Sequence, residues 1–287
     1  MSTPETDEAT GVDTTGHEWD GIKELNNPLP RWWLWCFYLT IIWGIGYTIA
    51  YPAWPMVSGA TSGVLGYSTR AEVAKEIAEY ETQNAELVSA LAEVELASLG
   101  QNADLQRFAV ANGAAVFRNN CSQCHGAGAA GATGYPNLLD DDWLWGGSIE
   151  QIAYSIRHGI RNETDSDAHY SEMPAFGDIL EDAEVEAVLN HVLSISGGEA
   201  DAALAEQGAV LFEDNCAACH GSEGMGDPEQ GAPNLTDAIW LYGGDPQAIR
   251  TTIVEARFGV MPAWGQRLSE AEVNAVAAYV HGLGGGE

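Results

Sequence analysis

A single uninterrupted apolar stretch lies near the start of the chain. Residues 32–51 read WWLWCFYLTIIWGIGYTIAY and contain no charged side chain. A helix rises about 1.5 Å per residue, so a segment of this length spans a hydrocarbon core of roughly 30 Å. Aromatic residues typical of membrane interfaces lie at both ends, namely Trp32, Trp33 and Trp35, and Tyr47, Tyr51 and Trp54. The pattern predicts a transmembrane helix over 32–54, with a buried core helix as the alternative.

The flanks of this segment indicate how it sits in a membrane. A cleaved signal peptide has a shorter apolar region followed closely by a small-residue cleavage site, and neither is present here, so we expect an uncleaved signal anchor. Lys23 and Arg31 precede the helix, whereas the next basic residue after it is Arg70. The positive-inside rule then places segment 1–31, expected to be mostly irregular, in the cytoplasm and the remainder outside.

Residues 55–104 are predicted to form a linker and an amphipathic helix. The linker is rich in Gly, Ser and Pro, and a capping-box pattern at 69–72 opens the helix. Apolar residues then recur at helical spacing, at Val73, Ile77, Tyr80, Leu87, Leu91 and Val94. This apolar stripe could dock on the following domain or on a partner subunit, and the sequence does not distinguish the two.

The rest of the chain contains an internal repeat. NNCSQCHG at 119–126 returns as DNCAACHG at 214–221, and MPAFG at 173–177 returns as MPAWG at 261–265. The change in spacing places about nine additional residues in the first copy, within 157–170. We predict two homologous domains, 105–197 and 198–287. Their apolar positions recur at helical and not at alternating intervals, so the predicted fold class is all-α.

Two pentads in the repeat carry the chemistry. The sequence C-x-x-C-H is the attachment signature of c-type haem, because two thiols on one helical turn reach the two vinyl groups while the histidine reaches the iron. A thioredoxin-like pair would need a βαβ context and a zinc site four ligands, and neither accounts for the histidines. We therefore expect two covalently bound haem c groups, held by Cys121, Cys124 and His125, and by Cys216, Cys219 and His220.

A methionine in each copy is the candidate for the sixth ligand. Met173 and Met261 each precede a proline in matching loops of the repeat. A thioether there gives His/Met ligation, which raises the potential of cytochromes c. The metal ligands are then His125, Met173, His220 and Met261. The alternatives are methionines that only pack in the core, and His158 or His169 at the first iron.

The net charge of the chain excludes one class of binding partner. The chain has 42 Asp and Glu against 11 Lys and Arg, a net charge of −31. Binding of nucleic acid needs a basic face, so nucleic acid is excluded as a partner. The acidity is either a solvated surface or a field that attracts a basic electron donor.

The motifs together resemble a known family. WDGIKELNNPLPRWWLW at 19–35, before a single membrane helix and two CxxCH domains with YPNL, WLWGG, MPAFG and MPAWG, resembles the membrane-anchored dihaem subunit (CcoP or FixP, subunit III) of cbb(3)-type cytochrome c oxidases. The resemblance implies two class I cytochrome c domains on the periplasmic side of a bacterial inner membrane. It implies as partners the catalytic haem-copper subunit, a monohaem cytochrome c subunit and a cytochrome c donor.

The resemblance also implies roles for single residues. Ligation would pair His125 with Met173 and His220 with Met261, although the residues alone do not decide whether each methionine serves its own domain. The carbonyl groups of Pro136 and Pro233 would steady the histidines. Arg157 and Trp143 would lie near haem propionates, and Arg257 could substitute in the second copy, where position 254 is Val.

The function expected from these features is electron relay. The membrane segment lacks the histidines that haem b and copper need, and both irons have side-chain ligands, so no catalytic residue is predicted and whether the subunit counts as an enzyme stays open. The alternatives are a dihaem cytochrome c peroxidase, which needs an open iron, a freestanding membrane-anchored dihaem cytochrome c, and a haem-based gas sensor. The donor and the role of Cys36 also stay open.

Overall fold

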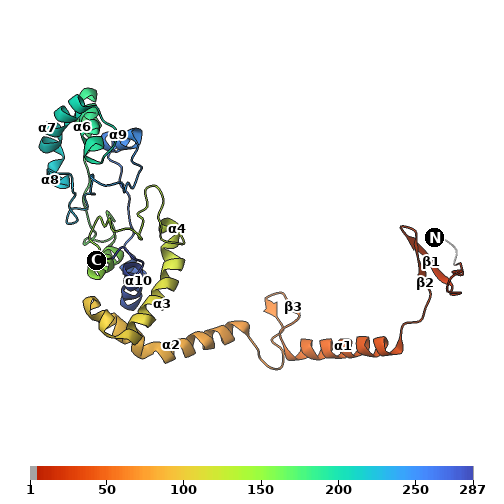
Figure 1. The fold of residues 1–287 in the computed structure, drawn as a ribbon. Coiled ribbons are helices and arrows are strands. Elements are labelled where there is room, and N and C mark those ends of the chain that lie inside the picture. The colour runs from red at the N-terminus through yellow and green to blue at the C-terminus, as the bar shows by residue number, and fades with distance from the viewer. Residues whose placement is uncertain (1–4, 287) are drawn as a thin grey trace. The chain divides into compact units, whose positions relative to one another are not determined.

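The computed structural model describes residues 5–286 and divides into two units, Met1–Thr82 and Gln83–Glu287 (Figure 1). The first unit holds the apolar helix and the second holds both C-x-x-C-H pentads. Each unit is described by itself.

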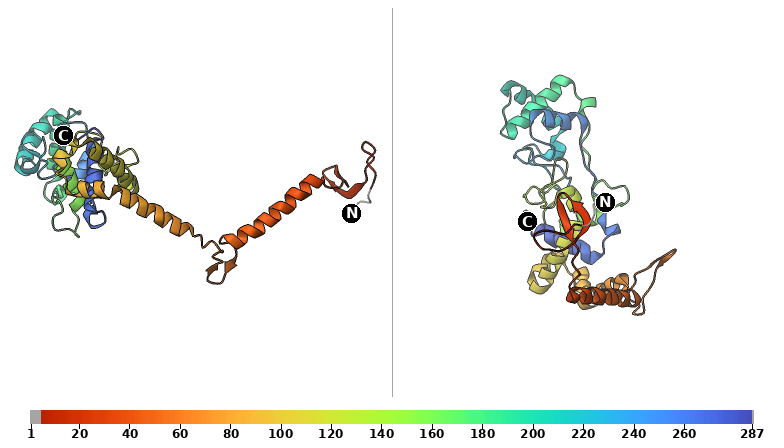
Figure 2. Two further views of the ribbon diagram at one scale, coloured as in Figure 1. Left: turned by 90° about the horizontal axis from the view of Figure 1, so that it is seen from below. Right: turned by 90° about the vertical axis from the view of Figure 1, so that its right-hand side faces the viewer.

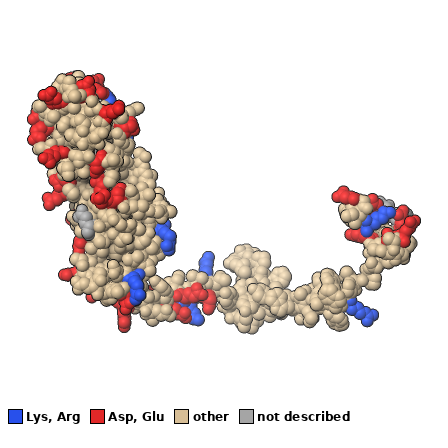
Figure 3. Space-filling view, viewed as in Figure 1, with Lys and Arg blue, Asp and Glu red and all other residues tan. Residues whose placement is uncertain are grey.

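Helix α1 (Arg31–Ala50) matches the predicted membrane segment. It is 20 residues long, and none of its residues is buried against protein. It starts directly after Pro30 and ends before Tyr51, so it is slightly shorter than the predicted 32–54. The space-filling view shows no acidic side chain along it (Figure 3). An apolar helix exposed on every side is suited to lipid or to partner helices.

The segment before α1 is more ordered than predicted. Strands β1 (Thr14–Trp19) and β2 (Ile22–Leu25) form an antiparallel hairpin. Asp20 and Gly21 at its turn have φ angles of 49° and 84°, as the favoured two-residue hairpin turns with an Asp-Gly sequence require. The expectation of an irregular segment was therefore wrong here, and the Asp-Gly pair was the missed signal. A second short hairpin, β3 (Pro55–Met56) with β4 (Gly59–Ala60), lies in the linker.

The predicted amphipathic helix is α2 (Thr69–Glu93), followed by the 3₁₀ helix η1 (Leu96–Gln101). The part of α2 from Gln83 onward belongs to the second unit and packs on the helices of that unit. Leu91 is 1% exposed and packs in a cluster with Leu105 and Ala275, and the buried side chain of Asn274 donates a hydrogen bond of 2.9 Å to the Leu91 carbonyl oxygen. In contrast, Val73, Ile77 and Tyr80 nearer its start are exposed.

Among residues 83–286 the structure shows helices and isolated β-bridges but no strand, which confirms the all-α prediction for the repeats. The helices of the first copy are α3 (Ala103–Asn120), α4 (Ser122–His125), α5 (Ile149–His158), η2 (Phe176–Asp178) and α6 (Asp182–Ile195). Those of the second copy are α7 (Ala202–Asn215), α8 (Ala217–His220), α9 (Pro246–Glu255), η3 (Trp264–Gln266) and α10 (Glu270–His281).

The two copies exchange their closing helices. Helix α10 packs on α3 and α5, whereas α6 packs on α7 and α9 (Figures 1 and 2). One core accordingly contains Phe117 of α3 with Val276 of α10. The other contains Phe212 of α7 with Val188 of α6. The predicted boundary between 105–197 and 198–287 is therefore a boundary in sequence, but each core draws on both sides of it.

Matched glycines bring the exchanged helices close together. A β-carbon on Gly113 of α3 would lie 2.1 Å from the carbonyl oxygen of Ala275 in α10. A β-carbon on Gly208 of α7 would lie 1.9 Å from that of Ala187 in α6. Since Gly113 and Gly208 occupy corresponding positions of the repeat, the two cores have the same helix contact, each made with the other copy's closing helix.

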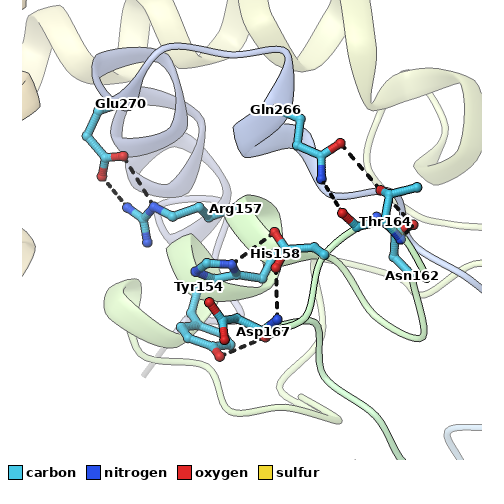
Figure 4. Close-up of polar contacts among 9 residues, drawn as sticks. Tyr154, Arg157, His158, Asn162, Thr164, Asp167, Gln266 and Glu270 are labelled. Atoms are coloured by element: carbon cyan, nitrogen blue, oxygen red, sulfur yellow. Dashed lines mark hydrogen bonds and ion pairs between the residues drawn. The ribbon is translucent and has the colours of Figure 1, made fainter.

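Polar contacts join α5 and the loop after it to the exchanged segment of the second copy. The Arg157 guanidinium forms an ion pair with Glu270 at the start of α10, and the Gln266 amide nitrogen donates a hydrogen bond of 2.8 Å to the Thr164 carbonyl oxygen (Figure 4). Thr164 belongs to the additional residues of the first copy, which thus contact η3 of the second copy.

Candidate haem-binding sites

Each pentad forms a short helical turn at the end of a longer helix. Helix α3 ends at Asn120, and Cys121 accepts hydrogen bonds from the backbone N–H groups of Cys124 and His125, at 3.1 Å and 3.0 Å. Helix α7 ends at Asn215, and Cys216 accepts the same two bonds with the same lengths. One turn carries both thiols of a pentad and the following imidazole, as covalent attachment of haem c requires.

The environment of these side chains suits haem ligation. Burial raises the pKa of the Cys121 and Cys216 thiols to about 11, with a smaller contribution from the second cysteine of each pair. Burial also lowers the pKa of both histidines, and a backbone hydrogen bond partly opposes it. Buried histidines are therefore held neutral, which is the form that binds a metal ion.

Each histidine is oriented by a proline carbonyl. The Nδ1 atom of His125 lies 3.0 Å from the Pro136 carbonyl oxygen, and that of His220 lies 3.0 Å from the Pro233 carbonyl oxygen. A carbonyl oxygen can only accept, so Nδ1 carries the proton and Nε2 keeps its lone pair for iron. These are the two carbonyl contacts that the family resemblance implies.

The second pentad opens into an apolar cavity of about 1440 Å³, its open mouth included. Cys216, Cys219 and His220 line one part of it, and Met173 of the first copy lines another. Large apolar side chains complete the wall, including Phe176, Leu180, Val188, Leu235, Trp240 and Ile253. A flat apolar macrocycle with two thioether attachment points and two axial ligands fits this donor set.

The first pentad has the complementary arrangement. Met261 and Cys121 both pack against the core formed by α3, α5 and α10. Met261 is also fixed by its backbone, which pairs with Ile160 at the end of α5. Met261 therefore packs in the same core as Cys121, and Met173 lines the same cavity as His220. The resemblance implies His125 with Met173 and His220 with Met261. This packing favours the crossed pairing instead, and the pairing at the irons stays a prediction.

The rival histidines have other partners. His158 Nδ1 lies 3.1 Å from Asp165 Oδ2, and His169 Nε2 lies 3.1 Å from Ser155 Oγ. His169 also stacks on Trp145, with ring centroids 4.3 Å apart. Both histidines thus have partners in α5 and the loop that follows it, and Figure 4 shows His158 among them.

The residues that the resemblance places near propionates have defined protein contacts in the structure. Arg157 pairs with Glu270 and is not part of the His220 cavity, and the Trp143 indole N–H donates to the Gly285 carbonyl oxygen. Arg257 does line that cavity, and so does Arg161, which the sequence analysis missed. Position 258, which corresponds to Arg161 in the second copy, is Phe, so the repeat gave no signal for Arg161.

The two sites adjoin through matched aromatic residues. A β-carbon on Gly231, in the loop that orients His220, would lie 2.2 Å from the Trp145 ring. Gly134, in the loop that orients His125, lies against the Tyr242 ring and donates a backbone hydrogen bond of 2.8 Å to Leu241. Leu241 also lines the His220 cavity. The loop of one site is thus in direct contact with the wall of the other.

Comparisons with known proteins identify the family of the chain. The family model described as cytochrome c oxidase, cbb3-type, subunit III matches residues 108–192 and 203–280, more than half of the chain. The model described as the N-terminal domain of cytochrome oxidase-cbb3, FixP, matches residues 11–58. The chain belongs to this family. The CcoP/FixP family assignment covers both the membrane helix and the two haem-binding repeats.

Relatives in the family are similar over nearly their whole length. The cbb3-type cytochrome c oxidase subunit CcoP of Cereibacter sphaeroides is 58% identical over 276 residues, which cover 96% of this chain and 95% of the relative. The subunit CcoP of Rhodobacter capsulatus is 54% identical, with 96% and 97% covered. The subunit FixP of Sinorhizobium medicae is 53% identical, with 98% and 97% covered.

Proposed function

We propose that this chain is the electron-transfer subunit of a cbb3-type cytochrome c oxidase and carries two covalently bound haem c groups. The observation that carries the proposal is the donor set at each pentad. A helical turn supplies two cysteines and a histidine, a proline carbonyl fixes the histidine, and a methionine from the other copy lies in the same core. The similarity to CcoP and FixP subunits supports the assignment to an oxidase.

Crossed ligation is part of this proposal. His125 and Met261 would bind the haem of Cys121 and Cys124, whereas His220 and Met173 would bind the haem of Cys216 and Cys219. Each haem would then hold together segments of both copies. His/Met ligation supplies a high-potential, six-coordinate iron when the haem is bound, and the chain's own residues anchor, orient and shield it.

The route of electrons follows from the adjoining sites. With both haems bound, an electron from the donor would pass between them across the contact of Gly134 with Leu241 and of Gly231 with Trp145 and would then leave for the catalytic subunit. A dihaem peroxidase would need an iron without a methionine, and both Met173 and Met261 pack against the cores of the pentads. This observation favours relay over peroxidase chemistry.

The proposed setting is a bacterial inner membrane. Residues 1–31 lie in the cytoplasm, segment 32–54 crosses the membrane as α1, and the linker and helix over 55–104 lead to the two haem-binding repeats, 105–197 and 198–287, in the periplasm. Basic residues before α1 and its apolar, fully exposed surface support this orientation. The partners are the catalytic haem-copper subunit, a monohaem cytochrome c subunit and a cytochrome c donor.

Haem stoichiometry tests the proposal. We expect two haems per chain in the purified complex, one in a Cys121/Cys124 double-alanine variant and one in a Cys216/Cys219 double-alanine variant. A denaturing gel stained for haem, with pyridine haemochrome analysis of the same sample, measures all three. Retention of two covalent haems in either variant would contradict it. A variant at Cys36, which lies in α1 outside both pentads, serves as the control.

A further inference from the structure

Two arginines converge on the cavity of His220 and Met173. Arg161 follows α5 in the first copy, and Arg257 follows α9 in the second. Only 11 of the 287 residues are Lys or Arg, so two cations in the wall of one apolar cavity are a notable concentration of positive charge. Glu172 also lines the cavity.

Arg161 has acceptors but no ion-pair partner among the described residues. Its Nε atom donates to the Gly259 carbonyl oxygen and its Nη1 atom to that of Ser171, each at 2.8 Å. Burial lowers the pKa of Arg161, and the nearby Tyr242 and Glu172 offset only part of this effect. A guanidinium has five N–H donors, so donors remain for an anion. A partly buried cation without a carboxylate partner is costly unless an anion joins it.

Arg257 is held in a similar way. Its guanidinium donates to the Thr252 hydroxyl and to the Ala248 carbonyl oxygen, and it lies 4.7 Å from the centroid of the Tyr242 ring. No ion pair joins it to a carboxylate in the described part of the chain. By contrast, Arg157 and Arg250 on the neighbouring helices each pair with glutamate.

We propose that Arg161, together with Arg257, binds the propionate groups of the haem attached to Cys216 and Cys219. This inference rests on the proposed haem binding and specifies which residues neutralise the charged edge of one haem. Propionates are carboxylates, the planar anions that guanidinium groups bind best. An apolar cavity can accept them only with cations in its wall.

Arg161 can reach the second site because of its position between the two segments that connect the exchanged helices. Gly259 and Ser171, its two carbonyl partners, lie in the two segments that connect the exchanged parts of the copies. The guanidinium therefore joins both connecting segments while it faces the second site. The corresponding position of the second copy is Phe258, whose ring lies 5.7 Å from Arg161. The first haem site thus receives no equivalent arginine, and the effect of Arg161 should be confined to one haem.

The test is a redox titration of the purified full complex with Arg161→Gln. A cation near a haem favours the ferrous state, because the ferric state carries one more positive charge. We expect the ratio of ferrous to ferric second haem at a fixed ambient potential to fall about tenfold, or ~59 mV for one electron. The first haem should titrate unchanged. A preparation that also lacks haem on Cys121 and Cys124 assigns the signals.

Three variants separate charge from structure. Arg161→Lys keeps the charge and should restore most of the ratio, whereas loosening of the cavity would not be reversed by lysine. Arg257→Gln should shift the same haem in the same direction, and it tests the pair if the Arg161 variant does not assemble. Arg250→Gln, which removes an ion-paired surface arginine of α9, should leave both haems unchanged.

Two results can be told apart. If Arg161→Gln and Arg257→Gln retain two haems and both titrate as the unmodified chain does, or if Arg250→Gln shifts the second haem equally, the propionate assignment is overturned. If the unmodified complex carries no haem on Cys216 and Cys219, the proposed function fails first. The haem stain and the methionine-to-iron charge-transfer band of the same samples distinguish the two.

Discussion

Ile160 and Met261 form a reciprocal backbone pair, in which each N–H donates to the other's carbonyl oxygen at 3.0 Å. Ile160 follows α5 in the first copy, and Met261 begins the Met-Pro loop of the second copy. The pair joins the two copies at the residue proposed as an axial ligand. Met261 is therefore positioned by the copy whose haem we propose it ligates.

This pairing makes crossed ligation directly testable. Met261→His should lower the potential of the haem on Cys121 and Cys124, because imidazole donates more strongly than thioether and favours ferric iron. The decisive sample is the double-alanine variant at Cys216 and Cys219, which has only the first haem. Redox titration should show the shift there. If Met261→His instead acts only on the second haem, ligation is not crossed.

The matched glycines predict which substitutions lower the stability of the contacts between α3 and α10 and between α7 and α6. Gly113→Ala and Gly208→Ala should each lower the free energy of unfolding by about 1–2 kcal/mol. The alanine gains up to about 1 kcal/mol in helix propensity, but its β-carbon meets a backbone oxygen that cannot rotate away, and overpacking costs about 1–3 kcal/mol or more. Denaturant unfolding followed by circular dichroism measures this in the full chain.

Gly100→Ala is the matched control for these variants. Gly100 lies in η1, and a β-carbon there would have no atom within 4 Å. Its effect should be small. Equal effects of Gly100→Ala and Gly113→Ala would mean that the close approach of α3 to α10 contributes little to stability.

The raised pKa of Asp142 predicts an unusual pH dependence of the stability of the fold. Burial, reinforced by Asp237, Asp140 and Asp141, raises its pKa to about 6. The folded pKa lies above the unfolded value of about 3.9, so ionisation of this group disfavours the fold. Its contribution to stability is complete below about pH 4 and is lost as the pH rises through about 6.

Removal of that charge should stabilise the protein at neutral pH. Asp142→Asn should raise the free energy of unfolding at pH 7 by about 1 kcal/mol, a value discounted for the partial exposure of the group. The gain should disappear near pH 4. Asp178→Asn, at an exposed position in η2, is the control. Thermal unfolding from pH 4 to pH 8 measures both, and a gain independent of pH would refute the assignment to Asp142.

The acidic surface predicts that the rate of electron uptake depends on salt. The net charge is −31, and acidic side chains gather over the end of the haem-binding unit that holds α6 and α7 (Figure 3). The exposed ones there include Glu181, Asp182, Asp201, Glu206, Glu213 and Asp214. Electron uptake from a basic cytochrome c should slow steeply as salt rises, because at about 0.15 M the field reaches only about 8 Å.

A neutral small-molecule donor provides the control for that experiment. Its rate should barely change over the same range of salt, since no charged encounter is involved. Stopped-flow reduction of the haems with each donor gives the comparison. An identical salt response with both donors would show that the acidity is a general surface property and does not guide docking.

The sequence was sufficient to predict those features that depend on local pattern. The apolar run defined α1, the repeat defined two sets of helices, and the pentads identified Cys121, Cys124, Cys216 and Cys219 as the attachment points. The exchange of α6 and α10 could not be predicted in this way. Both helices carry the same spacing of apolar residues, and Ala187 and Ala275 occupy corresponding positions, so either helix satisfies the pattern that Gly113 requires.

Residues defined by tertiary contacts were missed for the same reason. The position that corresponds to Arg161 in the repeat is Phe258, and the carbonyl partners of Arg161, Gly259 and Ser171, come together only after the exchange. Arg157 was expected near a propionate from the resemblance, and its ion pair with Glu270 of the exchanged α10 was not foreseen. A local sequence pattern contains no information about a contact with a residue that is distant along the chain.

The packing of α10 on α3 determines the order in which the sites can mature. Synthesis begins at the N-terminus, so Cys121, Cys124 and His125 emerge early, whereas Met261 and α10 emerge after α6, α7 and α9, the helices around the second site. The site that is first along the chain is therefore the last to be completed. A premature stop codon just before α10 would remove the closing helix of the first haem site and leave the helices around the second one intact.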